Sequence, residues 1–140
     1  MPARDRYHQV VVEALEAEGW RITHDPFSIP VGRRSLLVDL GAECLLAAEN
    51  EERQIAVEVK TFGGPSDVRD LSEALGQYLL YETFLQDYQP PRPLYLALTD
   101  DAYRRIFKDP LGQGVMDRFP LKLLVFNPNE KAITQWIPKL

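Results

Sequence analysis

An acid and an amine stand two positions apart in the segment QIAVEVKTF, residues 54–62. Every second residue of this segment is β-branched, which is the period of a strand with two unlike faces. Glu58 and Lys60 therefore point to the same side of the predicted strand, roughly 7 Å apart along the chain. A solvated strand face explains this pair, and a metal-dependent phosphodiesterase site explains it as well.

A second carboxylate, Asp39, lies in the apolar segment LLVDLGAE. An unpaired carboxylate is costly to bury, although a bond to a turn at Gly41 would account for it. We predict three strands, over residues 35–40, 42–49 and 53–62, that form an antiparallel meander with a turn at 50–53. Asp39 and Glu58 then lie on its first and third strands, where their side chains can converge.

Two converging carboxylates repel each other, and a divalent cation relieves the repulsion. Mg²⁺ or Mn²⁺ is the expected ion, because Mg²⁺ prefers a few carboxylate oxygens together with waters and phosphate. Asp39 and Glu58 are therefore the predicted metal ligands. Lys60 would orient or deprotonate an attacking water, or stabilise charge on a phosphate.

The helix predicted after the third strand carries an amide and a phenol, Gln77 and Tyr81. At positions i and i+4 they lie on the same face of the helix. Together they can bind a phosphate, a base edge or a water at the site. A core tyrosine beside a glutamine that satisfies a backbone group is the simpler interpretation.

The remaining elements must position these residues. We predict a helix over residues 5–19, an irregular connection over 20–35, a helix over 67–88 with Ser66 as its N-cap, a strand over 94–99, a helix over 101–119 broken near Pro110–Gly112, and strands over 121–128 and 132–138 joined by a turn at 127–130. The order αβββαβαββ predicts a single α/β (α+β) domain over residues 1–140. Its mixed sheet should be flanked by helices.

Composition limits the function classes. The chain has 140 residues, of which 45% are hydrophobic and 26% charged, as in soluble globular proteins. Its net charge of −5 argues against strong nonspecific binding of nucleic acid, but allows a local basic patch. Neither a secretory segment nor a membrane span is evident, which predicts a cytoplasmic protein. Cys44 is predicted to be a small buried hydrophobic residue.

The spacing of Asp39, Glu58-Val59-Lys60, Gln77 and Tyr81 resembles the PD-(D/E)XK nuclease superfamily, particularly its RecB and Holliday-resolvase branches. Over nearly the whole chain, YHQVVVEALEAEGWRITHDP, VDLGAE, IAVEVKTF, ALGQYLLYE and QWIP are similar to the XisH family, the fdxN element excision controlling factors of filamentous cyanobacteria. The resemblance implies a restriction-endonuclease-like three-layer core. It departs at Val38, which replaces the superfamily's proline.

The XisH resemblance also implies partners and a further site residue. The partners would be DNA, a companion XisI-like protein and a separate site-specific recombinase, and a homo-oligomer is compatible with the sequence. Many superfamily members carry a glutamate on the first helix, for which Glu13, Glu16 and Glu18 are all candidates. His8 could face the site too, although a structural histidine is the simpler interpretation.

Three functions remain open on the sequence. The first is a factor in developmentally regulated, site-specific DNA excision with a metal-dependent endonuclease site. The second is a catalytically inactive nuclease-fold accessory protein that binds DNA or a partner protein and controls a recombinase. The third is a toxin-like or defence nuclease. Arg33, Arg34 and Arg69 could contact phosphates, although adjacent arginines usually form a solvated loop tip.

Overall fold

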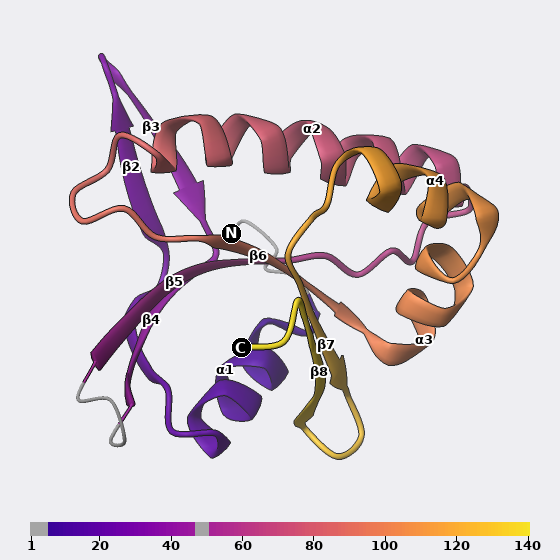
Figure 1. Ribbon diagram of the computed structural model, residues 1–140, viewed down its shortest axis with the longest axis horizontal. Coiled ribbons are helices and arrows are strands. Elements are labelled where there is room, and N and C mark those ends of the chain that lie inside the picture. Colours follow the sequence, from indigo (N-terminus) through magenta and orange to yellow (C-terminus); the bar gives the residue numbers. More distant parts are fainter. Residues whose placement is uncertain (1–5, 47–50) are drawn as a thin grey trace.

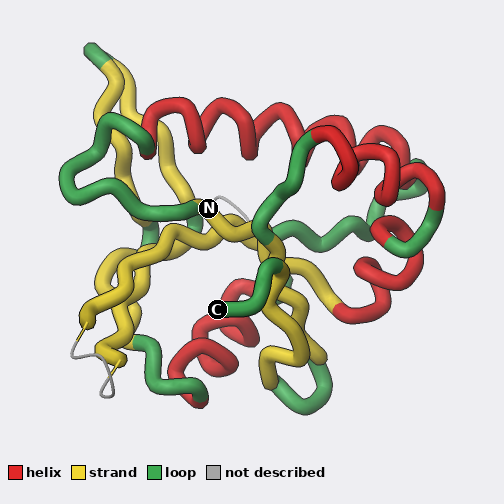
Figure 2. Tube along the Cα trace, viewed as in Figure 1, coloured by secondary structure: helices red, strands yellow, loops and turns green. Residues whose placement is uncertain are grey.

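The computed structural model describes residues 6–46 and 51–140 (Figures 1 and 2). Its elements are α1 (His8–Ala17), β1 (Arg21–His24), β2 (Phe27–Val31), β3 (Arg34–Val38), β4 (Leu40–Leu46), β5 (Glu51–Val59), α2 (Asp67–Leu85), β6 (Leu94–Thr99), α3 (Asp100–Ala102), the π-helix η1 (Tyr103–Phe107), α4 (Pro110–Arg118), β7 (Leu123–Asn127) and β8 (Ala132–Ile137). A six-stranded sheet has the order β1-β4-β5-β6-β7-β8, and β2 and β3 form a second, two-stranded sheet.

The large sheet is mixed. Strands β5, β6 and β7 run parallel and are joined by helical crossovers, whereas β1, β4 and β8 pair antiparallel with their neighbours. The predicted α/β fold with a mixed sheet flanked by helices is thus confirmed. None of the helices in the described ranges combines the length and hydrophobicity that a membrane span requires.

The helices cover opposite faces of this sheet (Figure 1). Ile55, Val57 and Val59 of β5 pack in one hydrophobic cluster with residues of α1. Ala56 packs in the other cluster, with residues of α2 and of the segment from α3 to α4. Since side chains alternate along a strand, Glu58 shares the face of Ala56 and points to the side of the sheet that α2 covers.

The prediction of three strands between the first two long helices was wrong, because the described residues of this segment form five. The supposed irregular connection contains β1 and β2, whose pattern is interrupted by Pro26 and Pro30. The predicted strand over residues 35–40 is divided at Asp39, so that β3 pairs with β2 while β4 pairs with β1 and β5. Gly41 lies inside β4 instead of separating strands. A Cβ atom there would be 2.7 Å from a ring carbon of Phe27.

The helix predicted over residues 101–119 is broken close to Pro110–Gly112 as expected, but the break precedes Pro110 instead of including it. Pro110 begins α4, where a proline is well tolerated, and the Asp109 side chain accepts a hydrogen bond from the Leu111 backbone N–H at 3.1 Å. The interruption between η1 and α4 consists of residues 108–109. Cys44 is half-buried, not buried as predicted.

The helix α2, which carries Gln77 and Tyr81, begins directly after Ser66, as the predicted N-cap requires. The Ser66 hydroxyl accepts a hydrogen bond from the Arg69 backbone N–H at 3.2 Å, and α2 ends before the prolines at 90–91. Parts of three predicted elements fall outside the described residues: the start of the first helix at Asp5, the strand end at 47–49 and the turn residue Asn50.

Candidate active site

Asp39 and Glu58 meet at the point where the small sheet continues into the large one. The Val59 backbone N–H donates a 2.8 Å hydrogen bond to Asp39 Oδ2, and the Asp39 N–H donates a 3.1 Å bond to Glu58 Oε1. The two acids converge because Leu40 pairs with Val57 in the adjacent strands β4 and β5. In the predicted meander the second strand would lie between the two acids in the sheet, whereas in the structure Asp39 immediately precedes β4, which is paired directly with β5.

Lys60 completes a compact group of charges. Its Nζ lies 3.6 Å from Glu58 Oε2, and its side chain is 25% exposed. The Lys60 backbone N–H donates to the Ala97 carbonyl at 2.9 Å, which ties the residue to β6 just beyond the end of β5. The Lys60 side chain is therefore more exposed to solvent than the carboxylate with which it pairs.

The protonation of Glu58 is strongly affected by its surroundings. Burial of its side chain is the largest effect, and together with the negative charge of Asp39 it raises the pKa of Glu58 to about 7, while Lys60 acts in the opposite direction. The carboxyl group consequently exchanges its proton near neutral pH. Any additional positive charge at the site favours the ionised form.

Tyr81 and Gln77 lie along α2 on the same side as the two acids. Burial raises the pKa of Tyr81 to about 12, and the charges of Glu58 and Asp39 add to the effect. The Gln77 Oε1 atom is buried and has no hydrogen-bond partner within the described part of the chain. No hydrogen bond between described residues joins either side chain to the two acids, but Tyr81 lies near enough for their charges to affect its pKa.

The acid pair is suited to a divalent cation. Both groups offer oxygen atoms, and with Glu58 ionised the pair carries two negative charges, against which the described residues place one ammonium group, that of Lys60 beside Glu58. Two carboxylates plus water and phosphate oxygens form the usual ligand set of Mg²⁺. Within residues 6–46 and 51–140, however, no third His, Cys, Asp or Glu joins them in a metal-binding cluster. The protein's own ligands would be Asp39 and Glu58.

The glutamates of the first helix do not reach this site. The helix α1 packs on the opposite face of the sheet from Glu58. Glu13 forms a 3.5 Å ion pair with Lys131, and Glu18 accepts a 3.1 Å hydrogen bond from the Trp136 indole. Glu16 lies exposed on the same helix.

His8 is a structural histidine. It is buried, and its Nε2 lies 2.9 Å from Asp25 Oδ1. The contact joins the start of α1 to the segment between β1 and β2. The simpler of the two sequence interpretations therefore describes it.

Glu73 was missed by the sequence analysis. It lines a cavity of about 200 Å³ with Lys60, Asp70 and residues 61–63. The signal was present in the sequence, because Glu73 precedes Gln77 by four residues and so continues the stripe of Gln77 and Tyr81 along α2. Its carboxylate also pairs with Arg69 at 3.5 Å.

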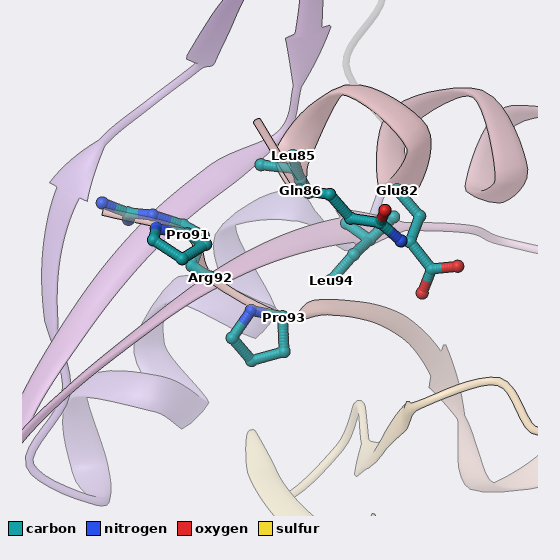
Figure 3. Close-up of a pocket in the computed structure, with 7 residues that line it drawn as sticks. All are labelled: Glu82, Leu85, Gln86, Pro91, Arg92, Pro93 and Leu94. Carbon is teal, nitrogen blue, oxygen red and sulfur yellow. The ribbon is translucent and has the colours of Figure 1, made fainter. Parts of the chain in front are cut away.

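A separate cavity of about 290 Å³ lies near the C-terminal end of α2 (Figure 3). It is lined by Glu82, Leu85, Gln86 and residues 91–94. None of the five predicted site residues contributes to it. Its buried arginine, Arg92, was not singled out from the sequence either.

Comparison with known proteins identifies relatives over nearly the whole chain. The sequence profile described as XisH protein matches residues 1–134. An XisH family protein from Nostoc punctiforme has a crystal structure with a TM-score of 0.83 and 38% identity, covering 94% of this chain and 98% of that one. An fdxN element excision controlling factor protein from Anabaena variabilis has a TM-score of 0.84 and 36% identity, covering 96% and 99%. No curated protein matches the sequence.

Proposed function

Because the chain belongs to the XisH family, we propose that it acts in DNA excision and that Asp39, Glu58 and Lys60 hydrolyse phosphodiester bonds with Mg²⁺ or Mn²⁺. The name of the Anabaena relative supports the excision role. The resemblance to the PD-(D/E)XK superfamily supports the chemistry. The observation that carries the proposal is the meeting of two carboxylates from separate segments beside an amine. The Glu58 carboxylate accepts a hydrogen bond from the Asp39 N–H, the Asp39 carboxylate accepts one from the Val59 N–H, and Lys60 pairs with Glu58.

Each residue has a defined role in this reaction. Asp39 and Glu58 would hold the divalent ion, which supplies positive charge for the phosphate and lowers the pKa of a nucleophilic water when bound. Lys60 orients the attacking water or stabilises the negative charge that develops on the phosphate. Gln77 and Tyr81 bind the water, the phosphate or the adjacent strand by hydrogen bonds.

The test is cleavage of DNA by the purified protein. We expect plasmid or branched DNA to be cut in Mn²⁺, and Asp39→Ala to lose this activity. Asp117→Ala, an exposed acid on α4, is the matched control and should cut like the wild type. Equal inactivity of the wild type and Asp39→Ala on every substrate, with a companion XisI-like protein present, would contradict the enzymatic proposal.

A nonenzymatic accessory role is the second candidate. It is favoured by the two backbone hydrogen bonds of the acids, which also fasten the junction between the sheets. In that case the protein would bind DNA or a protein partner and control a separate recombinase. Calorimetry with Mg²⁺ and Mn²⁺ separates the two roles. A saturable heat of metal binding that Glu58→Gln abolishes supports the enzymatic role. The absence of any heat of metal binding in the wild type supports the accessory role.

A further inference from the structure

The two-stranded sheet forms an arm that projects from the body of the protein (Figure 1). Strands β2 and β3 pair in register from Phe27↔Val38 at the base to Val31↔Arg34 at the tip. Gly32 turns the chain with a φ of +58°, a conformation that favours glycine. The arm is thus a regular hairpin with one end free.

The base of the arm is fixed firmly. Phe27, Ile29 and Val38 are almost completely buried in the core that α2 covers. The Arg92 guanidinium lies over the Phe27 ring, 4.5 Å from its centroid, and donates a 3.3 Å hydrogen bond to the Ile55 carbonyl. In Figure 3 this side chain extends away from the nearby Glu82. These contacts fix the orientation of the arm relative to β5.

The tip of the arm carries unneutralised positive charge. Arg33 and Arg34 are exposed, and no acidic residue occurs between residues 27 and 38, although the whole chain has a net charge of −5. Across residues 6–46 and 51–140, no carboxylate forms an ion pair with either arginine. Other arginines differ, since Arg21 pairs with Glu43 at 2.9 Å and Arg105 with Asp101 at 3.0 Å.

The arm also leads directly to the acid pair. Asp39 follows the last residue of β3 without an intervening loop. At about 3.3 Å per strand residue, Arg34 lies roughly 16 Å from Asp39 along the arm. The phosphates of one DNA strand advance by about 3.4 Å per nucleotide, so this reach corresponds to roughly five nucleotides.

We propose that the β2–β3 arm holds the phosphate backbone of a nucleic acid with Arg33 and Arg34, about five nucleotides from the position bound at Asp39 and Glu58. The distance to a cut position rests on the proposed function, whereas the backbone contact itself does not. Arginine suits this role because its guanidinium group binds phosphate through two parallel hydrogen bonds.

Binding is measured by fluorescence anisotropy with labelled duplex and four-way-junction DNA in EDTA, where metal-dependent hydrolysis cannot occur. We expect the double variant Arg33→Ala/Arg34→Ala to bind both DNAs about tenfold more weakly at low salt. The slope of log affinity against log salt should become shallower by almost two, at about 0.9 for each lost phosphate contact. The charge-preserving Arg33→Lys/Arg34→Lys variant should retain most of the slope.

The matched control is Arg118→Ala/Lys139→Ala, which removes the same charge from exposed positions away from the arm. It should leave the affinity and the slope close to those of the wild type. An equal loss in this control, an unchanged slope in the arm variant, or no DNA binding by the wild type would overturn the proposal. Circular dichroism melting must show that the arm variant is folded.

The outcome is independent of the cleavage experiment. A protein that binds DNA through the arm but never cuts it fails the enzymatic proposal and keeps the arm contact. A protein that cuts DNA with an unchanged salt slope in the arm variant keeps the enzymatic proposal and refutes the arm contact. Calorimetric Mn²⁺ binding should be the same in the arm variant and the wild type.

Discussion

Two neighbours act on the ionisation of Glu58 in opposite directions, because Asp39 opposes it and Lys60 favours it. The pKa of the folded state, about 7, lies above the ordinary value of 4.5. Glu58 therefore stabilises the fold when it is protonated, an effect that is complete below the unfolded pKa and is lost as the pH rises through about 7. A buried carboxyl group can in this way make a protein less stable in mild alkali.

We predict that Glu58→Gln removes this dependence on pH. Between pH 5 and pH 8 the wild type should lose on the order of 2 kcal/mol of unfolding free energy from this group. The variant should lose much less, because its amide does not titrate. Urea denaturation at both pH values measures the difference. Glu16→Gln, at an exposed position of α1, should retain the wild-type dependence, and a parallel loss in Glu58→Gln would refute the assignment.

Two tyrosines one turn apart on α2 should respond differently to loss of their hydroxyl groups. Tyr78 is buried, donates to the Leu94 carbonyl at 3.0 Å and accepts from the Lys122 N–H at 3.2 Å. Tyr78→Phe should therefore destabilise the fold by about 1–3 kcal/mol, since two backbone groups lose their partner.

Tyr81→Phe should change the unfolding free energy by less than about 0.5 kcal/mol. DNA cleavage should nevertheless fall about tenfold, the effect of one lost hydrogen bond in the transition state. Thermal melts and cleavage rates of the two variants give both quantities. A stable Tyr81→Phe variant with full activity would remove Tyr81 from the site.

The helix α4 packs so closely on the preceding π-helix η1 that one glycine of α4 has no room for a side chain. A Cβ atom at Gly112 would collide with the Ile106 carbonyl oxygen and the Phe107 Cα, whereas one at Gly114 would meet nothing within 4 Å. Gly112 is therefore required by packing, and Gly114 is not.

We predict opposite effects of alanine at these two glycines. Gly112→Ala should destabilise the protein by about 2 kcal/mol or more, because backbone atoms would have to move. Gly114→Ala should stabilise it by about 0.5–1 kcal/mol, since alanine favours a helix over glycine. Chemical denaturation of the two variants suffices. Equal changes in unfolding free energy at both positions would show that the close contact between Gly112 and η1 does not prevent a side chain at residue 112.

The elements that the sequence predicted well are those whose pattern is long and uninterrupted. The 19-residue helix α2 has a clear cap and periodic apolar positions, and β6 is a wholly buried apolar run. β1 and β2 were not predicted, because they are short and their polar and proline positions hide the alternation. Pro110 was read as a helix breaker, although at the first position of a helix it favours helix formation.

The site residues also divide into those with a clear local sequence pattern and those whose position depends on the tertiary structure. Asp39, Glu58 and Lys60 could be selected from residue types and spacing within one part of the chain. The face of the sheet that α1 covers depends on the sheet order, which no local pattern specifies, so Glu13, Glu16 and Glu18 could not be excluded. Glu73 could hardly be predicted as a site residue, because α2 has several acidic residues on its surface and the spacing from Gln77 distinguishes this one only weakly.

Metal binding at the acid pair should stabilise the entire fold, by an amount that depends on pH. Mn²⁺ at about 100 times its dissociation constant would add roughly 2.7 kcal/mol to the unfolding free energy. We predict a larger increase in melting temperature at pH 8 than at pH 5.5, because the ion must compete with the proton of Glu58 at the lower pH.

Scanning calorimetry with Mn²⁺ and then with EDTA measures this difference. EDTA should restore the metal-free melting temperature, and Asp39→Asn should abolish the response to Mn²⁺. An equal increase in Asp39→Asn would show that the ion binds elsewhere.

Asp39 is the single residue between β3 of the arm and β4 of the large sheet, and this restricts how the chain length can vary at that position. One extra residue there would invert the side chains of either β3 or β4, since strand residues alternate between faces. An insertion beside Gly32, at the free end of the hairpin, would disturb neither. Evolutionary gains and losses of residues should therefore collect at the tip and be absent from the junction.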